Sequence, residues 1–138
     1  MYQRKAYDRL RKWKERSKGS TALLLEGARR VGKSTLAEEF ARTEYASYLL
    51  IDFSVVSAEV EALFLDHRGD VDSFFMYLLA YYGISLPRRD SLIIFDEVQR
   101  FPAARGFLKQ LVADGRYDYL ETGSLLSIRR NVEGILIP

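Results

Sequence analysis

The chain has 138 residues, of which 48% are hydrophobic and 29% are charged, and its formal net charge is +2. A chain of this length fits one folded domain with its own core, and the composition excludes disordered and collagen-like classes. Because the sequence contains no cysteine, disulfides, thiolate zinc sites and a cysteine nucleophile are excluded, which is compatible with a reducing cytosol.

The sequence shows neither a secretory signal nor a membrane span. Residues Met1–Lys5 lead into further charge instead of an apolar segment with a cleavage site, so we expect a cytoplasmic protein. The most apolar window, residues 74–86, contains Gly83 and is shorter than the roughly 20 residues of a membrane-spanning helix. It predicts a buried helix and no membrane partner.

Basic charge is concentrated near the N-terminus. Residues 1–20 carry eight Lys or Arg against Asp8 and Glu15, a local charge of +6 that leaves −4 for the remainder. Apolar residues at helical spacing predict an amphipathic helix over residues 3–17, ahead of a core formed by residues 21–138. The charge indicates either a solvated helix face or a surface for nucleic-acid phosphate or an acidic partner.

Strand and helix patterns alternate after this segment. Predicted strands cover residues 21–26, 48–53, 91–96 and 117–122, and predicted helices cover residues 34–42, 57–66, 71–82 and 102–113. This alternation predicts an α/β fold, a three-layer α/β/α sandwich with a mostly parallel sheet and ligands at the carboxyl ends of its strands. The apolar residues 135–138 look like the start of a fifth strand, so we expect a fragment that is incomplete at its C-terminus.

The first candidate site is a phosphate-binding loop between the first predicted strand and the helix after it. The P-loop pattern G-x-x-x-x-G-K-[ST], with one further threonine, matches Gly27, Ala28, Arg29, Arg30, Val31, Gly32, Lys33, Ser34 and Thr35. Its glycines let backbone N–H groups turn toward a β-phosphate, and the following helix presents its positive end. Lys33 would reach the β- and γ-phosphates, and Ser34 would coordinate Mg²⁺. A coincidental glycine turn is the alternative, but the position between strand and helix favours a nucleoside triphosphate, most simply ATP with Mg²⁺.

The second candidate site lies at the end of the third predicted strand. The apolar residues Leu92–Phe95 deliver Asp96 and Glu97 to the carboxyl end of that strand, as in a Walker B segment. Asp96 would hold Mg²⁺ through a water, and Glu97 would be the general base for the water that attacks the γ-phosphate. Many strands end in acidic residues, so this pattern indicates a functional site only in combination with the P-loop.

The third candidate is the segment Glu121–Ser124, after the fourth predicted strand. A hydroxyl of Thr122 or Ser124 would hold the attacking water there, and a simple turn is the alternative.

The only histidine, His67, is expected at a solvated helix end. Four arginines near the strand ends are candidates for charge-stabilising fingers, in the same or a neighbouring subunit: Arg100, Arg105, Arg129 and Arg130. The alternative is that each is a surface residue.

Together these motifs resemble the AAA-type P-loop ATPases of bacteria and archaea, in particular a subgroup whose ATPase core precedes a C-terminal domain of uncharacterised function. The resemblance rests on Gly27–Thr35, on the Asp-Glu-Val-Gln string at residues 96–99 and on Glu121–Ser124. It covers nearly all of the chain, including the basic segment before the P-loop. Members of the group continue beyond the position of Pro138, so the partners that it implies include a C-terminal domain of the same chain and further copies in a homo-oligomer.

The resemblance also implies roles for single residues. Lys33 and Ser34 would contact phosphate and Mg²⁺, Asp96 would hold the metal, Glu97 would act as the base, and the Thr122–Ser124 turn would sense the γ-phosphate. The function that follows is ATP binding with hydrolysis that drives or switches an attached module.

Other functions are kept as alternatives. A nucleotide-dependent binding module with little hydrolysis, associated with nucleic acid through the basic helix, is the non-enzymatic one. A small P-loop kinase would place an acceptor where the water sits, but Glu97 directly after Asp96 favours water activation. A GTPase is disfavoured, because the sequence lacks the Asn-Lys-x-Asp string that would recognise guanine.

Overall fold

A computed structural model describes residues 2–27, 32–124 and 133–136. Its sheet has five parallel strands in the order β2-β3-β4-β1-β5. The strands are β1 (Leu23–Glu26), β2 (Ser47–Asp52), β3 (Ser91–Asp96), β4 (Asp118–Gly123) and β5 (Glu133–Leu136). The helices are α1 (Tyr2–Ser17), α2 (Lys33–Glu44), α3 (Ala58–Asp66), α4 (Val71–Tyr82) and α5 (Pro102–Asp114), with a short 3₁₀ helix η1 (Val98–Arg100) after β3.

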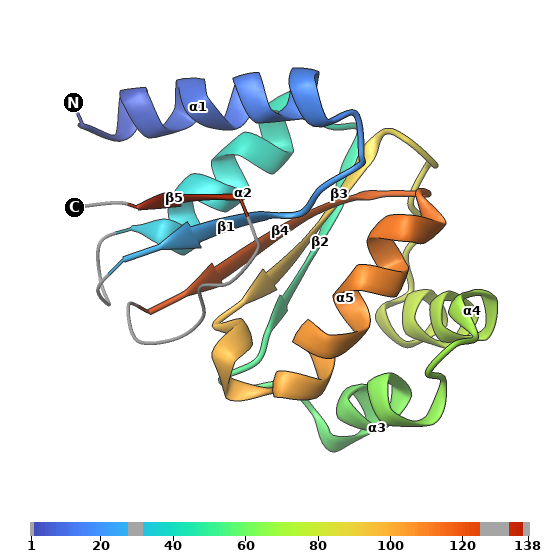
Figure 1. The fold of residues 1–138 in the computed structure, drawn as a ribbon. Coiled ribbons are helices and arrows are strands. Elements are labelled where there is room, and N and C mark those ends of the chain that lie inside the picture. Colours follow the sequence, from blue (N-terminus) through green and yellow to red (C-terminus); the bar gives the residue numbers. More distant parts are fainter. Residues whose placement is uncertain (1, 28–31, 125–132, 137–138) are drawn as a thin grey trace.

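Helices cover both faces of this sheet (Figure 1). Helices α1 and α2 pack on one face, where their apolar residues form one core with side chains of β1, β3, β4 and β5. Helices α3, α4 and α5 pack on the other face, where a second core includes side chains of β2, β3 and β4. The predicted three-layer α/β/α sandwich with a parallel sheet is therefore confirmed.

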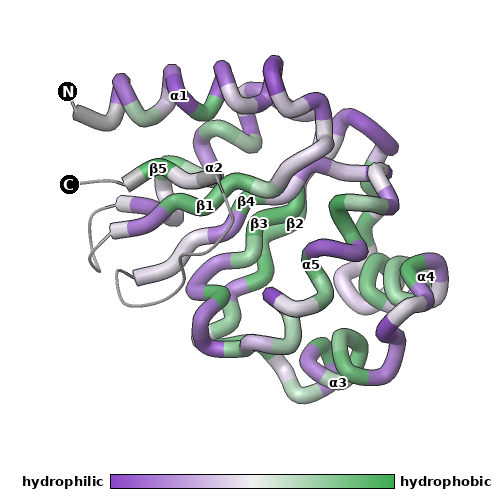
Figure 2. The backbone as a smooth tube through the Cα atoms, viewed as in Figure 1, coloured by the Kyte–Doolittle hydropathy of each residue, from purple (hydrophilic) through white to green (hydrophobic). Residues whose placement is uncertain are grey.

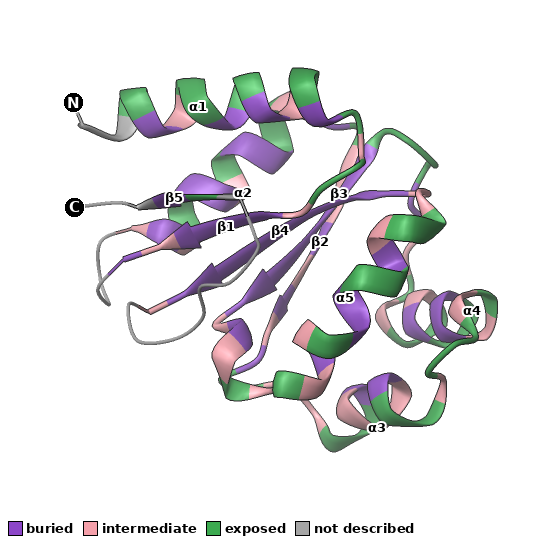
Figure 3. Ribbon diagram, viewed as in Figure 1, coloured by how far each residue is buried: buried purple, intermediate pink, exposed green. Residues whose placement is uncertain are grey.

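The strands separate the two cores because successive side chains of a strand point to opposite faces. In β3, Leu92 and Ile94 belong to the α1–α2 core, whereas Ile93 and Phe95 belong to the α3–α5 core. All six residues of β3 are buried, as they are in β4. The continuous apolar run that predicted a buried strand reflects this burial on both faces, which Figures 2 and 3 show along the centre of the sheet.

Helix α4 differs from the buried helix predicted for residues 74–86. It ends at Tyr82, where Gly83 adopts a left-handed conformation with φ of 67°. One face is buried through Phe74, while Met76 on another face is 60% exposed. Only one face of this apolar helix is therefore buried, and some of its apolar side chains are exposed. In the described part of the chain no helix is long and apolar enough to cross a membrane.

Helix α1 is attached to the sandwich through α2. Leu10 and Trp13 are fully or nearly fully buried, and the Trp13 ring lies 6.4 Å from the ring of Phe40 on α2. The Tyr7 hydroxyl donates a hydrogen bond to Glu44 at the end of α2 over 2.9 Å. Helix α1 thus uses its apolar stripe on α2 and leaves its basic residues outside.

Candidate functional site

The carboxyl ends of the central strands form one edge of the sheet. Because the strands are parallel, the ends of β1, β3 and β4 lie side by side, and β2 places Asp52 beside Asp96 in register. Backbone hydrogen bonds continue past the strand ends, from Gly27 N–H to the Gly123 carbonyl over 3.4 Å and from Phe53 N–H to the Asp96 carbonyl over 2.9 Å. These bonds fix the segments that carry the predicted site residues.

The predicted phosphate loop is described at its two ends. Gly27 is buried directly after β1, and α2 begins at Lys33 behind Gly32, whose φ of 82° is left-handed and therefore suited to glycine. The Lys33 side chain is 4% exposed, and its ammonium donates a hydrogen bond to the Gly27 carbonyl over 3.2 Å. The predicted phosphate ligands Ala28, Arg29, Arg30 and Val31 lie outside the described residues.

Three predicted residues meet at a single carboxylate oxygen. The hydroxyl of Ser34, in the first turn of α2, donates to Asp96 Oδ1 over 2.8 Å. The hydroxyl of Thr122, in β4, donates to the same oxygen over 2.6 Å. The structure therefore joins the P-loop helix, β3 and β4 at Asp96. Thr35, the next residue of α2, is exposed.

The environment of Asp96 opposes its negative charge. Burial raises the pKa of the Asp96 carboxyl above its ordinary value, and the charges of Asp52 and Glu97 act in the same direction. Hydrogen bonds from Thr122 and Ser34 lower the pKa and offset part of this effect. A buried carboxylate that is crowded by other acids favours a nearby cation, since a positive charge within about 4–6 Å stabilises the charged form.

Glu97 follows Asp96 in an unusual backbone conformation. Its φ of 55° and ψ of 48° are left-handed, which costs a non-glycine residue about 1–3 kcal/mol. Its N–H donates to the Thr122 hydroxyl over 2.9 Å, which holds this turn against β4. On the side-chain side, the Gln99 amide donates to Glu97 Oε1 over 2.7 Å. The Glu97 carboxylate is thus positioned from both its backbone and its side chain.

Thr122 and Ser124 differ in what surrounds them. Thr122 is fully buried, and its hydroxyl lies between Asp96 and the Glu97 backbone. Ser124 is partly exposed beyond the end of β4, and its Oγ lies 3.5 Å from the Gln99 amide nitrogen. The sequence did not rank these two hydroxyls. The geometry assigns them different surroundings, with Ser124 the more accessible.

The arginines considered as charge-stabilising fingers also differ in their surroundings. Arg105, on α5, forms an ion pair with the fully buried Glu121 in which Nε and Oε1 are 2.6 Å apart. Arg100 is exposed at the end of η1, and Arg129 and Arg130 lie outside the described residues. His67 caps the C-terminus of α3 and stacks on Tyr77 at a centroid distance of 5.2 Å, at the helix end where it was predicted.

The donor set at Asp96 fits Mg²⁺. This ion prefers oxygen ligands and is commonly bound by one or two carboxylates together with substrate phosphates and water. Ser34 and Asp96 offer a hydroxyl and a carboxylate whose oxygens are 2.8 Å apart. Among the described residues, no group of three or more His, Asp or Glu could hold a metal ion by itself.

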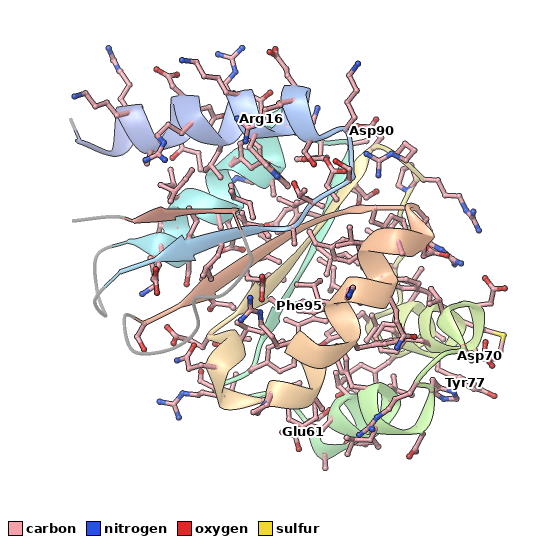
Figure 4. The ribbon with its side chains drawn as sticks, in the orientation of Figure 1. Arg16, Glu61, Asp70, Tyr77, Asp90 and Phe95 are labelled. Carbon is pink, nitrogen blue, oxygen red and sulfur yellow. The ribbon has the colours of Figure 1, made fainter. Side chains whose placement is uncertain are left out.

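Two residues of this edge were not singled out from the sequence. Asp52 ends β2 next to Asp96, and Gln99 contacts the Glu97 carboxylate. Asp52 carried a signal, since it lies near the end of the strand predicted over residues 48–53 and such ends converge in a parallel sheet. Gln99 was noted only as part of the Asp-Glu-Val-Gln string and was given no role, because its approach to Glu97 depends on the left-handed turn at Glu97. Figure 4 shows Phe95, which precedes the two acids, directed toward the α5 side of the sheet.

Comparisons with known proteins agree with this geometry. A family described as an AAA domain matches residues 19–134. Among solved structures, that of C. elegans PCH-2 is similar with a TM-score of 0.55 and 14% sequence identity over 96% of this chain, a likeness of fold. This chain spans 41% of the length of that chain. None of the curated proteins matches it. Since the family match extends over most of the chain, from before the P-loop to β5, the protein belongs to the AAA domain family of P-loop ATPases.

Proposed function

We propose that the chain binds ATP with Mg²⁺ at this edge of the sheet and hydrolyses it, and that hydrolysis drives or switches an attached module. The observation that carries the proposal is the meeting of Ser34, Thr122 and Asp96 at one carboxylate oxygen, with Glu97 next in sequence. These contacts bring the first turn of α2 close to two acidic residues, and a Mg²⁺-nucleotide site needs both.

In this proposal the phosphates lie at the amino end of α2. The Lys33 ammonium, which contacts the Gly27 carbonyl, would turn to the β- and γ-phosphates. Ser34 and Asp96 would hold the metal, directly and through a water respectively. The bound Mg²⁺ supplies charge neutralisation on the phosphate oxygens.

Glu97 would take a proton from the attacking water. Its Oε1 accepts a hydrogen bond from Gln99, so Oε2 is the oxygen assigned to the proton. The more accessible Ser124 would orient that water, whereas Thr122 would keep the Asp96–Glu97 turn in place. The alternative function, a nucleotide-dependent binding module with little hydrolysis, would need Lys33 and Asp96 but not Glu97.

The test is phosphate release together with binding of a fluorescent ATP analogue, each with Mg²⁺. Glu97→Gln should retain analogue binding and lose phosphate release, and Lys33→Ala should lose binding. Glu59→Gln and Lys109→Ala are matched controls on exposed helix positions. Unchanged phosphate release in Glu97→Gln would remove Glu97 as the base. Binding by the wild type with no phosphate release would support the binding module instead, and unchanged affinity in Lys33→Ala would overturn the nucleotide site.

A further inference from the structure

Helix α1 presents a stripe of positive charge on its outer side. Its buried stripe consists of Ala6, Leu10, Trp13 and Ser17, which pack against the rest of the molecule. One position earlier at each turn lies a second stripe in which every residue is basic and exposed: Lys5, Arg9, Lys12 and Arg16. At a rise of 1.5 Å per residue this basic stripe is about 16 Å long. Figure 4 shows nitrogen-tipped side chains projecting from α1 away from the sheet.

The basic stripe is not explained by the stability of the helix. The first turn of α1 contains no acidic residue, so Lys5 lies at the positive end of the helix dipole without compensation. Like charges three or four residues apart destabilise a helix by about 0.2–0.5 kcal/mol per pair. Lys5–Arg9 and Lys12–Arg16 are both such pairs. Among the described residues, Lys5, Arg9 and Lys12 form no ion pair.

Two neighbouring arginines are paired with acidic residues, in contrast to Lys5, Arg9 and Lys12. A pocket of about 470 Å³ opens between α1, the end of α2 and the starts of β3 and β4. There Arg89 pairs with Asp118 over 2.6 Å, and Arg11 lies 3.7 Å from Glu44. Acidic partners for basic residues near α1 thus lie in this pocket, whereas Lys5, Arg9 and Lys12 are exposed outside it.

We propose that the basic stripe of α1 binds the phosphate backbone of nucleic acid. Duplex DNA carries one negative charge per roughly 1.7 Å of its axis, so a stripe of this length meets several phosphates. An anionic membrane is a poor match, because a helix that binds a bilayer inserts its apolar side, and here Leu10 and Trp13 are 0% and 1% exposed against the protein core. The stripe contains no aromatic residue that would stack on a base, so binding should be independent of sequence.

This surface is separate from the proposed nucleotide site. The stripe lies on the outside of the α1–α2 layer, whereas Asp96 lies at the carboxyl edge of the sheet. Binding is therefore measured without nucleotide, and its failure would leave the proposed hydrolysis untouched.

The experiment is fluorescence anisotropy of a labelled DNA duplex, longer than the stripe, over a series of salt concentrations. Each phosphate neutralised contributes about 0.9 to the slope of log affinity against log salt. The triple variant Lys5→Gln, Arg9→Gln, Lys12→Gln should lower affinity by about tenfold or more and reduce the slope by about 2.7. The control Arg68→Gln, Arg88→Gln, Lys109→Gln removes the same charge from exposed positions outside α1 and should retain the wild-type slope.

Circular dichroism of both variants shows whether they are folded. Equal loss in the two triple variants would overturn the proposal, because net charge and not the stripe would then set the affinity. Wild-type affinity and slope in the stripe variant would also overturn it. So would tighter binding of polyglutamate or of anionic phosphatidylserine vesicles than of the duplex, since an acidic protein or a membrane would then be the partner.

Discussion

The Thr122 hydroxyl donates a hydrogen bond to Asp96 Oδ1 over 2.6 Å and accepts one from the Glu97 N–H over 2.9 Å. One buried oxygen thus connects β4 with Asp96, the last residue of β3, and with Glu97 directly after it. The contact opposes the crowding of negative charge at Asp96 and secures the left-handed turn at Glu97. The acids are therefore held in place by β4.

Replacing Thr122 by valine should loosen this connection. The substitution keeps the shape of the side chain but leaves the Glu97 N–H without its acceptor, and an unmade buried hydrogen bond costs about 1–3 kcal/mol. We expect the free energy of unfolding in urea to fall by this amount and Mg²⁺-nucleotide affinity to fall with it. Thr122→Ser keeps the hydroxyl and serves as the control. Wild-type values in Thr122→Val would show that the hydroxyl does not hold the turn.

Gln99 should act as a positioning residue for Glu97. Its amide donates to Glu97 Oε1 over 2.7 Å and lies 3.5 Å from Ser124 Oγ. In Gln99→Ala the carboxylate loses this restraint, so kcat for phosphate release should fall by about tenfold while KM changes little, since misplacement of a catalytic group mainly affects the transition state. Gln110→Ala, on the exposed face of α5, is the control. A rise in KM with unchanged kcat would instead place Gln99 in nucleotide binding.

Much of this architecture follows from local sequence patterns. The run Leu92–Phe95 predicted a buried strand over residues 91–96, and the observed β3 has these bounds. The helix predicted over residues 34–42 extends to Glu44 in the structure. Periodicity predicts the order of the elements, whereas the residue at which an element ends is less well defined by the sequence. The convergence of Ser34 and Asp96 followed from their places at a helix start and a strand end.

The contacts of Gln99 and the burial of Thr122 could not be predicted in the same way. Gln99 reaches Glu97 because of one left-handed residue, and glutamate has no strong preference for that conformation. Thr122 and Ser124 flank Gly123 with similar chemistry, and only the position at which β4 ends distinguishes a buried hydroxyl from an accessible one. Both features depend on tertiary geometry, not on spacing.

The Arg105–Glu121 pair should give stability a measurable pH dependence. Burial raises the pKa of Glu121 to about 7, against the lowering influence of Arg105. The folded state then holds a proton that the unfolded state has released, so the free energy of unfolding should fall as pH rises from about 4.5 to about 7. One pKa unit corresponds to about 1.4 kcal/mol, which makes the fall on the order of 3 kcal/mol.

The measurement is urea unfolding of the wild type and of Glu121→Gln across this pH range. The glutamine variant has no group to titrate, so the stability of the wild type relative to the variant should decrease toward neutral pH. Glu59→Gln, an exposed position on α3, should leave the pH profile unchanged. Parallel profiles for the wild type and Glu121→Gln would mean that Arg105 keeps Glu121 charged throughout.

Gly19 and Gly106 should respond to alanine in opposite directions. Gly19 has φ of 84°, and a Cβ there would lie 2.6 Å from the Arg89 guanidinium. That guanidinium is anchored by Asp118 over 2.6 Å, so it cannot move without weakening an ion pair. The left-handed conformation alone costs an alanine about 1–2 kcal/mol. Gly106 lies within α5, and a Cβ there would meet nothing within 4 Å.

Gly19→Ala should therefore lower the free energy of unfolding by more than the roughly 1–2 kcal/mol of the backbone conformation. Gly106→Ala should raise it by about 0.4–1 kcal/mol, because alanine loses less conformational entropy in a helix. Urea unfolding of both variants at one pH checks the pair. Adding Arg89→Ala to Gly19→Ala separates the two causes. If the double variant is no more stable than Gly19→Ala, the contact with Arg89 contributes nothing, and the cost at Gly19 arises from the backbone conformation alone.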